Sequence, residues 1–211
     1  MKNLLKKIES ATISLSIIFL LANCGGGTST NEYLGKLPGI AKNYTEKIDK
    51  KEKELKECTD MGKAFKLDNE VKSLGDEADK AIEEYLAKNP LNALPFEQKA
   101  DYPFTIQEVS VNTKNSSSIS RLQLITKVKI NQDIKNEYGG FKKTIFAYII
   151  AADKEGNSLI KRPGVLSSGF KSQEFKKGMD FKLEGSIDGV KNLVKFEKFV
   201  FISNEEYNKL K

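Results

Sequence analysis

The chain has 211 residues, carries a net charge of +6 and contains no histidine. Without histidine it cannot form a Ser-His or Cys-His catalytic pair, and it lacks the commonest side-chain ligand for metals. The positive charge is mild and comes with no recognisable nucleic-acid-binding module, so we expect no nucleic-acid partner.

The first residues have the charge order of a secretory signal peptide. Lys2, Lys6 and Lys7 form a basic start, and no charged residue follows between Ser10 and Glu32. The apolar core at 13–22 covers about ten residues, whereas a membrane-spanning helix needs about 20. We therefore expect residues 1–23 to be a cleaved signal peptide rather than a permanent transmembrane helix.

The end of this segment determines how the mature chain is anchored. Leu21-Ala22-Asn23-Cys24 resembles the lipobox of bacterial lipoproteins, with Asn23 in place of the usual Gly, Ala or Ser. The resemblance implies that Cys24 is diacylated and becomes the new N-terminus. Membrane lipid is then a partner, and the chain lies outside the cytoplasm, at the outer membrane or the cell surface. The alternative is an ordinary thiol behind an ordinary signal peptide.

Residues 24–37 are expected to form the lipidated cysteine and a flexible tether. Positions 25–31 hold only glycine, serine, threonine and asparagine, and therefore offer no apolar side chain to bury. Tracts of this composition behave as flexible spacers. The tether should lift the following domain off the membrane without fixing its orientation.

Residues 38–89 have the periodicity of two amphipathic helices. Apolar residues recur at intervals of three and four, first in Ala41, Tyr44, Ile48, Leu55 and Cys58, and then in Leu67, Val71, Leu74, Ala78, Ile82 and Tyr85. The second series is shifted in phase, which places a break near Gly62, and Pro90 follows the second helix. We expect an antiparallel helical hairpin with Cys58 buried on its apolar stripe. A single long helix or a coiled-coil partner is the structural alternative.

Residues 90–103 contain three prolines and predict a linker, and residues 104–211 then have the pattern of a β-domain. β-Branched and aromatic residues are concentrated at 104–113, 121–134, 143–153, 158–161, 179–187 and 194–203. The strand that ends in the Asp-x-x-Gly-Asn turn at 153–157 resembles those of small β-sandwich domains in secreted bacterial lipoproteins. The predicted fold class is α+β, an N-terminal helical hairpin followed by an antiparallel immunoglobulin-like β-sandwich.

The candidate binding surface combines lysine with phenylalanine in the last third of the chain. It comprises Lys171, Lys176, Lys177, Lys182, Lys191, Lys195 and Lys198, interleaved with Phe170, Phe175, Phe181 and Phe199. Such a face would suit an acidic protein or an anionic glycan as partner. In the alternative interpretation the phenylalanines fill the core and the lysines protect the outer face and edges of the sheet.

No pattern in the sequence points to catalysis, a metal or a cofactor. Asp153, Glu155 and Asn157 alternate as in a calcium loop but lack its later bidentate acid. We therefore predict no catalytic residue, no metal ligand and no cofactor, and a non-enzymatic binding or scaffold module of the bacterial cell envelope. The alternatives are an envelope structural or assembly factor that acts through the helical hairpin, and a carboxylate-dependent hydrolase.

Overall fold

The computed structural model describes residues 30–91, 93–113, 117–134, 144–169 and 174–211. The predicted signal peptide and Cys24 lie outside the described residues. No helix within these ranges is long and apolar enough to cross a membrane. In chain order the elements are α1 (Thr30–Lys56), α2 (Met61–Lys88), β1 (Phe96–Gln98), β2 (Phe104–Val111), β3 (Arg121–Ile130), β4 (Phe146–Ala152), β5 (Gly164–Ser167), β6 (Asp180–Asp188), the 3-10 helix η3 (Val190–Lys195), β7 (Lys198–Ile202) and α3 (Asn204–Leu210).

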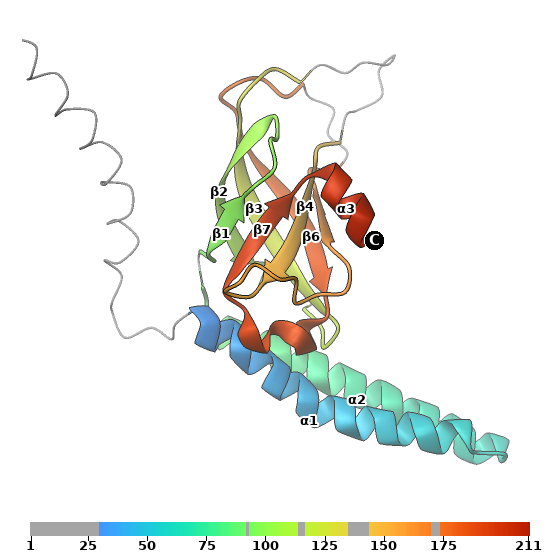
Figure 1. The fold of residues 1–211 in the computed structure, drawn as a ribbon. Helices are drawn as coiled ribbons and strands as arrows, with labels where there is room; N and C mark the ends of the chain where they lie inside the picture. The colour runs from blue at the N-terminus through green and yellow to red at the C-terminus, as the bar shows by residue number, and fades with distance from the viewer. Residues whose placement is uncertain (1–29, 92, 114–116, 135–143, 170–173) are drawn as a thin grey trace, which may run out of the picture.

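The two long helices form the predicted hairpin (Figure 1). The break lies just before α2, where the Asp60 side chain caps the helix by accepting a hydrogen bond from the Lys63 backbone N–H at 2.7 Å. Gly62, predicted to end the first helix, lies instead in the first turn of α2. Asn89 closes α2, with its backbone N–H donating to the Tyr85 carbonyl oxygen.

The predicted tether is wrong in its second half, because α1 begins at Thr30 rather than near Pro38. Tyr33, Leu34 and Leu37 lie in this early part of α1 and are fully buried. Burial of these three side chains against the rest of the fold stabilises a helical start that the glycines nearby would not favour on their own.

Only one half of the hairpin packs on the β-domain (Figure 1). The buried residues of α1 all lie between positions 33 and 41, and those of α2 after Leu67 are Ala78, Ile82 and Leu86. The remaining turns project away from the sheet. Cys58 is not on a helical stripe as predicted: it lies in the turn between the helices, half-buried, with its thiol near the Asp60 carbonyl oxygen.

The strands form one mixed sheet of seven strands in the order β1-β7-β4-β5-β6-β3-β2. The β1–β7 pair is parallel and every other pair is antiparallel. The sheet curls so that its two edges approach each other, since the Ile106 backbone N–H on β2 donates to the Gln98 side chain on β1 at 3.0 Å. The α+β class is confirmed. The expected pair of stacked antiparallel sheets is not what the strands form.

A curled sheet and a sandwich have the same inward and outward alternation along each strand, so strand patterns alone do not distinguish them.

Several short elements were also not predicted from the sequence. β1 lies inside the predicted linker, and β5, η3 and α3 were not expected. The segment 158–161 forms only an isolated bridge, between Ser158 and Ala152, at the end of the predicted turn.

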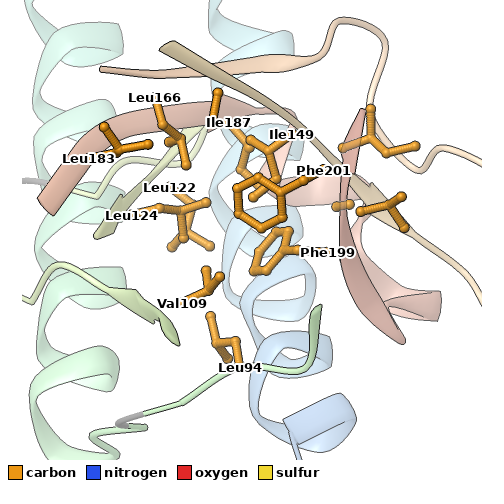
Figure 2. Close-up of a cluster of buried hydrophobic side chains, with 14 of the residues drawn as sticks. Leu94, Val109, Leu122, Leu124, Ile149, Leu166, Leu183, Ile187, Phe199 and Phe201 are labelled. Carbon is orange, nitrogen blue, oxygen red and sulfur yellow. The ribbon is translucent and has the colours of Figure 1, made fainter. Parts of the chain in front are cut away.

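The core fills the concave side of this sheet (Figure 2). Leu122 and Leu124 on β3 point inward with a period of two, toward Phe199 and Phe201 on β7. Leu94, within the predicted linker, is also buried, and its backbone N–H donates to the Val109 carbonyl oxygen at 2.7 Å. The segment before β1 is therefore part of the core rather than a spacer.

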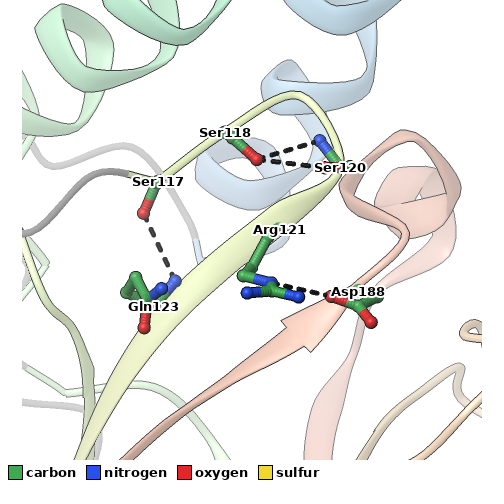
Figure 3. A network of polar contacts seen from close by, with 6 residues as sticks. All are labelled: Ser117, Ser118, Ser120, Arg121, Gln123 and Asp188. Carbon is green, nitrogen blue, oxygen red and sulfur yellow. Dashed lines mark hydrogen bonds and ion pairs between the residues drawn. The ribbon is translucent and has the colours of Figure 1, made fainter.

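One end of the sheet rests on the hairpin. The Asp79 side chain on α2 accepts a hydrogen bond from the Ile119 backbone N–H at 2.8 Å, which attaches the turn before β3 to the helix. Beside this turn, Arg121 forms an ion pair with Asp188 at 3.0 Å, across the β3–β6 pair (Figure 3). The helical hairpin and the β-domain consequently pack against each other, and they are not separate units joined only by a linker.

Candidate functional site

The structure does not bring the predicted lysines together on one surface. Lys176 and Lys177 precede β6, whereas Lys195 ends η3, which follows β6. The nine residues of β6 extend about 30 Å, so the two groups lie at opposite ends of the sheet. Lys171 lies outside the described residues. A single basic face that joins all of these lysines is therefore absent from the described part of the chain.

Two other predicted lysines, Lys182 and Lys198, lie on strands of the sheet. Lys182 is exposed on β6 beside Lys127 of β3. Lys198 forms an ion pair with Glu97 at 2.6 Å, joining the parallel strands β1 and β7. The hydrogen bond from Lys198 lowers the pKa of Glu97 below its usual value. This pair belongs to the sheet edge rather than to a ligand site.

The phenylalanines support the alternative interpretation of the lysine and phenylalanine pattern. Phe175 and Phe199 are buried in the core, and Phe181 is half-buried with its ring edge-on to Phe175, at 4.8 Å between centroids. Phe170 lies outside the described residues. The interleaving of the two residue types thus reflects inward aromatic and outward charged positions.

The Asp153 turn forms as predicted and uses its polar groups internally. The Asp153 carboxylate accepts a hydrogen bond from the Asn157 backbone N–H at 2.7 Å, and Gly156 takes the left-handed φ of 88° that the turn requires. Among the described residues no group of three or more Cys, Asp or Glu side chains is placed to hold a metal ion.

The tip of the hairpin has the most exposed large apolar side chains of the described residues. Met61 is 88% exposed and Phe65 is 69% exposed. They lie four residues apart on α2 and therefore share one face of the helix. From Ala41, the last buried residue of α1, to the end of that helix at Lys56 is about 22 Å, so this apolar pair stands well away from the sheet.

The part of the hairpin that carries the tip, which we name the shaft, is held together by contacts between α1 and α2. Leu67 is buried and Leu55 and Val71 are half-buried between the helices. Lys51 on α1 joins Glu70 on α2 at 2.7 Å, an ion pair near the surface that fixes the relative position of the helices more than it adds stability. The shaft thus presents Met61 and Phe65 on a defined support. The sequence offered an apolar pair at helical spacing, which by itself predicts burial.

Two cavities lie along α1, one beside η3 and the other, which reaches Glu52, beside the turns before β3 and after β6. One, of about 440 Å³, is lined by Pro38, Gly39 and Val194 among others, and the second, of about 600 Å³, shares Thr45 and Lys191 with it. They follow the seam where the hairpin meets the β-domain. Their lining includes no exposed aromatic side chain, in contrast to the tip.

Comparison of the chain with protein-family models, with curated proteins and with solved structures finds no match. A functional proposal therefore depends on the sequence and the geometry of the chain itself.

Proposed function

We propose that this chain is a bacterial lipoprotein, held outside the cytoplasm by a diacylated Cys24, that acts as a non-enzymatic binding or scaffold module through its helical hairpin. The observation that carries the proposal is the exposed apolar pair Met61 and Phe65 at the end of a projecting shaft. The lipid anchor is supported by the lipobox-like sequence that ends at Cys24.

The position of the anchor suits a hairpin that reaches outward. Cys24 precedes the start of α1 at Thr30 by six residues, a stretch that spans at most roughly 20 Å. The 27 residues of α1 add about 40 Å. The tip can consequently operate up to roughly 60 Å from the lipid, while the base of the hairpin stays fixed to the β-domain.

The chemistry of the tip suits a partner with an apolar pocket. Methionine adapts its shape to irregular apolar surfaces, and aromatic side chains and methionine are enriched at protein interfaces. An exposed phenylalanine contributes favourable binding free energy when a partner covers it, because its apolar surface leaves water. The charged side chains along the shaft keep the unbound hairpin in solution.

Photo-crosslinking in the native membrane tests this proposal. The photo-reactive residue p-benzoylphenylalanine replaces Phe65 in one variant and Lys53, an exposed residue on the shaft, in a matched control. We expect a discrete crosslinked adduct from position 65 and none from position 53, and we expect Met61→Ser to weaken the adduct. Equal crosslinking from both positions, or none from either, would contradict a binding role of the tip.

The same surface would serve an envelope structural or assembly factor. The two functions differ in what the partner loses when the tip is changed. With Phe65→Ser, loss of partner localisation at normal partner abundance indicates a scaffold, whereas misassembled or degraded partner indicates an assembly factor. In both cases the protein to be followed is the partner captured by crosslinking at position 65.

A further inference from the structure

A second, separate site lies at the end of the sheet remote from the hairpin. An open cavity of about 680 Å³, which we name the Tyr102 cavity, is lined by Tyr102 and Pro103 before β2 and by Gln132 and Asp133 after β3. The start of β4 and the start of α3 complete its lining. Its volume falls within the range of small-molecule sites, about 300–1,000 Å³. The cavity does not involve the hairpin, so it can be judged independently of the function proposed above.

Aromatic rings form one wall of the Tyr102 cavity. Phe146 and Tyr148 are two residues apart on β4 and therefore project from the same face of that strand. Phe146 is 47% exposed, an unusual position for a phenylalanine on a central strand. Tyr148 is held by stacking on Tyr207 of α3, at 4.3 Å between ring centroids.

Tyr102 is fixed in place on the same wall. Its ring stacks on Phe104 at 4.8 Å between centroids, nearly parallel at 10°. Its hydroxyl accepts a hydrogen bond from the Tyr148 backbone N–H and donates to the Ile202 carbonyl oxygen. Burial raises the pKa of Tyr102 to about 12. These contacts present a rigid aromatic surface that loses little conformational entropy when a ligand stacks on it.

The rim of the cavity is polar and lacks basic side chains among its described lining residues. Asp101 and Asp133 contribute carboxylates, and Gln132 and Asn204 contribute amides that both donate and accept hydrogen bonds. Asp133 is oriented by the Lys177 backbone N–H, which donates to its carboxylate at 2.7 Å. Two carboxylates, with no basic side chain among the described lining residues, disfavour an anionic ligand.

We infer that the Tyr102 cavity binds a neutral carbohydrate. The weakly positive C–H face of a sugar ring packs on the negative face of an aromatic ring. Sugar hydroxyls donate to carboxylates and accept from amides, so they can match every kind of polar group on this rim. A quaternary ammonium cation would also stack on the rings, but its charged group accepts no hydrogen bond and would leave most of the amide donors on the rim without a ligand partner.

A glycan array probed with the detergent-solubilised full chain, followed by calorimetric titration of the bound sugars, tests this inference. The array carries neutral oligosaccharides and sulfated or carboxylated ones, and choline is titrated separately as an organic cation. We expect binding to neutral members only. Phe146→Ala should weaken it by at least about tenfold, and Asp101→Asn should weaken it less because one side-chain oxygen remains.

Val194→Ala is the control, since Val194 is 68% exposed on η3 at the opposite end of the sheet, and it should leave the affinity unchanged. Circular dichroism of each variant verifies that the fold is retained. Binding restricted to anionic sugars or to choline, no binding to the array, or an unchanged affinity in Phe146→Ala would overturn the inference. Failure here leaves the crosslinking experiment on the hairpin unaffected, because the two sites share no residue.

Discussion

Tyr85 on α2 stacks its ring on Tyr33 of α1, at 5.6 Å between centroids, and donates its hydroxyl to the Tyr33 carbonyl oxygen at 3.0 Å. The Tyr33 hydroxyl has a different environment: it is buried and has no hydrogen-bond partner within the described chain. A buried polar group without a partner costs about 1–3 kcal/mol. Tyr33→Phe should therefore raise the free energy of unfolding by about 1 kcal/mol.

The neighbouring tyrosine gives the matched comparison. Tyr85→Phe leaves the Tyr33 carbonyl oxygen without its side-chain donor and should lower the free energy of unfolding by about 1 kcal/mol. Both values can be measured by urea unfolding followed by circular dichroism. A destabilised Tyr33→Phe variant would show that its hydroxyl has a partner, such as a buried water molecule.

Tyrosine burial also predicts how stability changes at alkaline pH. Burial, and secondarily the proximity of Tyr85, raises the pKa of Tyr33 to about 12 from 10.0. Between these values the unfolded chain loses the phenol proton while the folded chain keeps it, so the unfolded state binds fewer protons. The free energy of unfolding is therefore unaffected by Tyr33 ionisation below pH 10, and it falls as the pH rises toward 12.

Urea unfolding at several values between pH 9 and pH 12 measures this loss. We expect a smaller decrease in Tyr33→Phe than in the unchanged chain, since phenylalanine has no proton to lose. The difference should reach at most about 1.4 kcal/mol per pH unit. Identical pH profiles in both chains would contradict the raised pKa of Tyr33.

Gly185 on β6 allows the close approach of β5. A Cβ atom placed at Gly185 would lie 2.2 Å from the Val165 carbonyl oxygen and 2.9 Å from the Leu166 Cα, both backbone atoms that cannot rotate away. Gly185→Ala should consequently destabilise the fold by about 3 kcal/mol or prevent β5 from pairing.

Gly75 provides the control for this substitution. It lies inside α2, and a Cβ atom there would meet nothing within 4 Å. Gly75→Ala should stabilise the chain by up to about 1 kcal/mol, because alanine favours the helix over glycine. Thermal unfolding of both variants separates the two cases, and equal effects would show that Gly185 is not a close contact.

The hairpin could be predicted because its apolar period extends over many turns and dominates local preferences. Its first two turns could not, since Tyr33, Leu34 and Leu37 are mixed with Gly35 and Pro38, and only their burial against the rest of the fold favours helix there. The same limit applies to β1, whose three residues pair with β7 about a hundred positions later in the chain. Such elements depend on tertiary contacts that carry no local periodicity.

The candidate sites were harder to predict from the sequence than the fold. Met61 and Phe65 have the spacing of core residues, and only the projection of the hairpin leaves them exposed. Tyr102 and Tyr148 are 46 positions apart, and their hydrogen bond exists because β4 passes beside the segment before β2. The lysine pattern, in contrast, was visible in the sequence but reflects the alternation of faces along strands.

The two cysteines of the chain provide a test of the proposed lipid anchor. Cys24 follows the lipobox-like residues, whereas Cys58 lies half-buried in the turn between the helices, with its thiol donating to the Asp60 carbonyl oxygen. Only Cys24 should carry acyl chains. Mass spectrometry of the protein extracted from membranes should therefore find a mature chain that begins at Cys24 with lipid attached.

Substitution of each cysteine separates anchoring from folding. Cys24→Ala should abolish lipidation and release the chain from the membrane fraction, because one or two acyl chains supply most of the membrane affinity of a lipid-anchored protein. Cys58→Ala should leave the chain in that fraction, since its contacts are confined to the hairpin turn. Fractionation of cells that express each variant measures the outcome. If Cys24→Ala stays membrane-bound and unmodified, the anchor is not a lipid on this cysteine, and the apolar tip at Met61 and Phe65 becomes the next membrane contact to test.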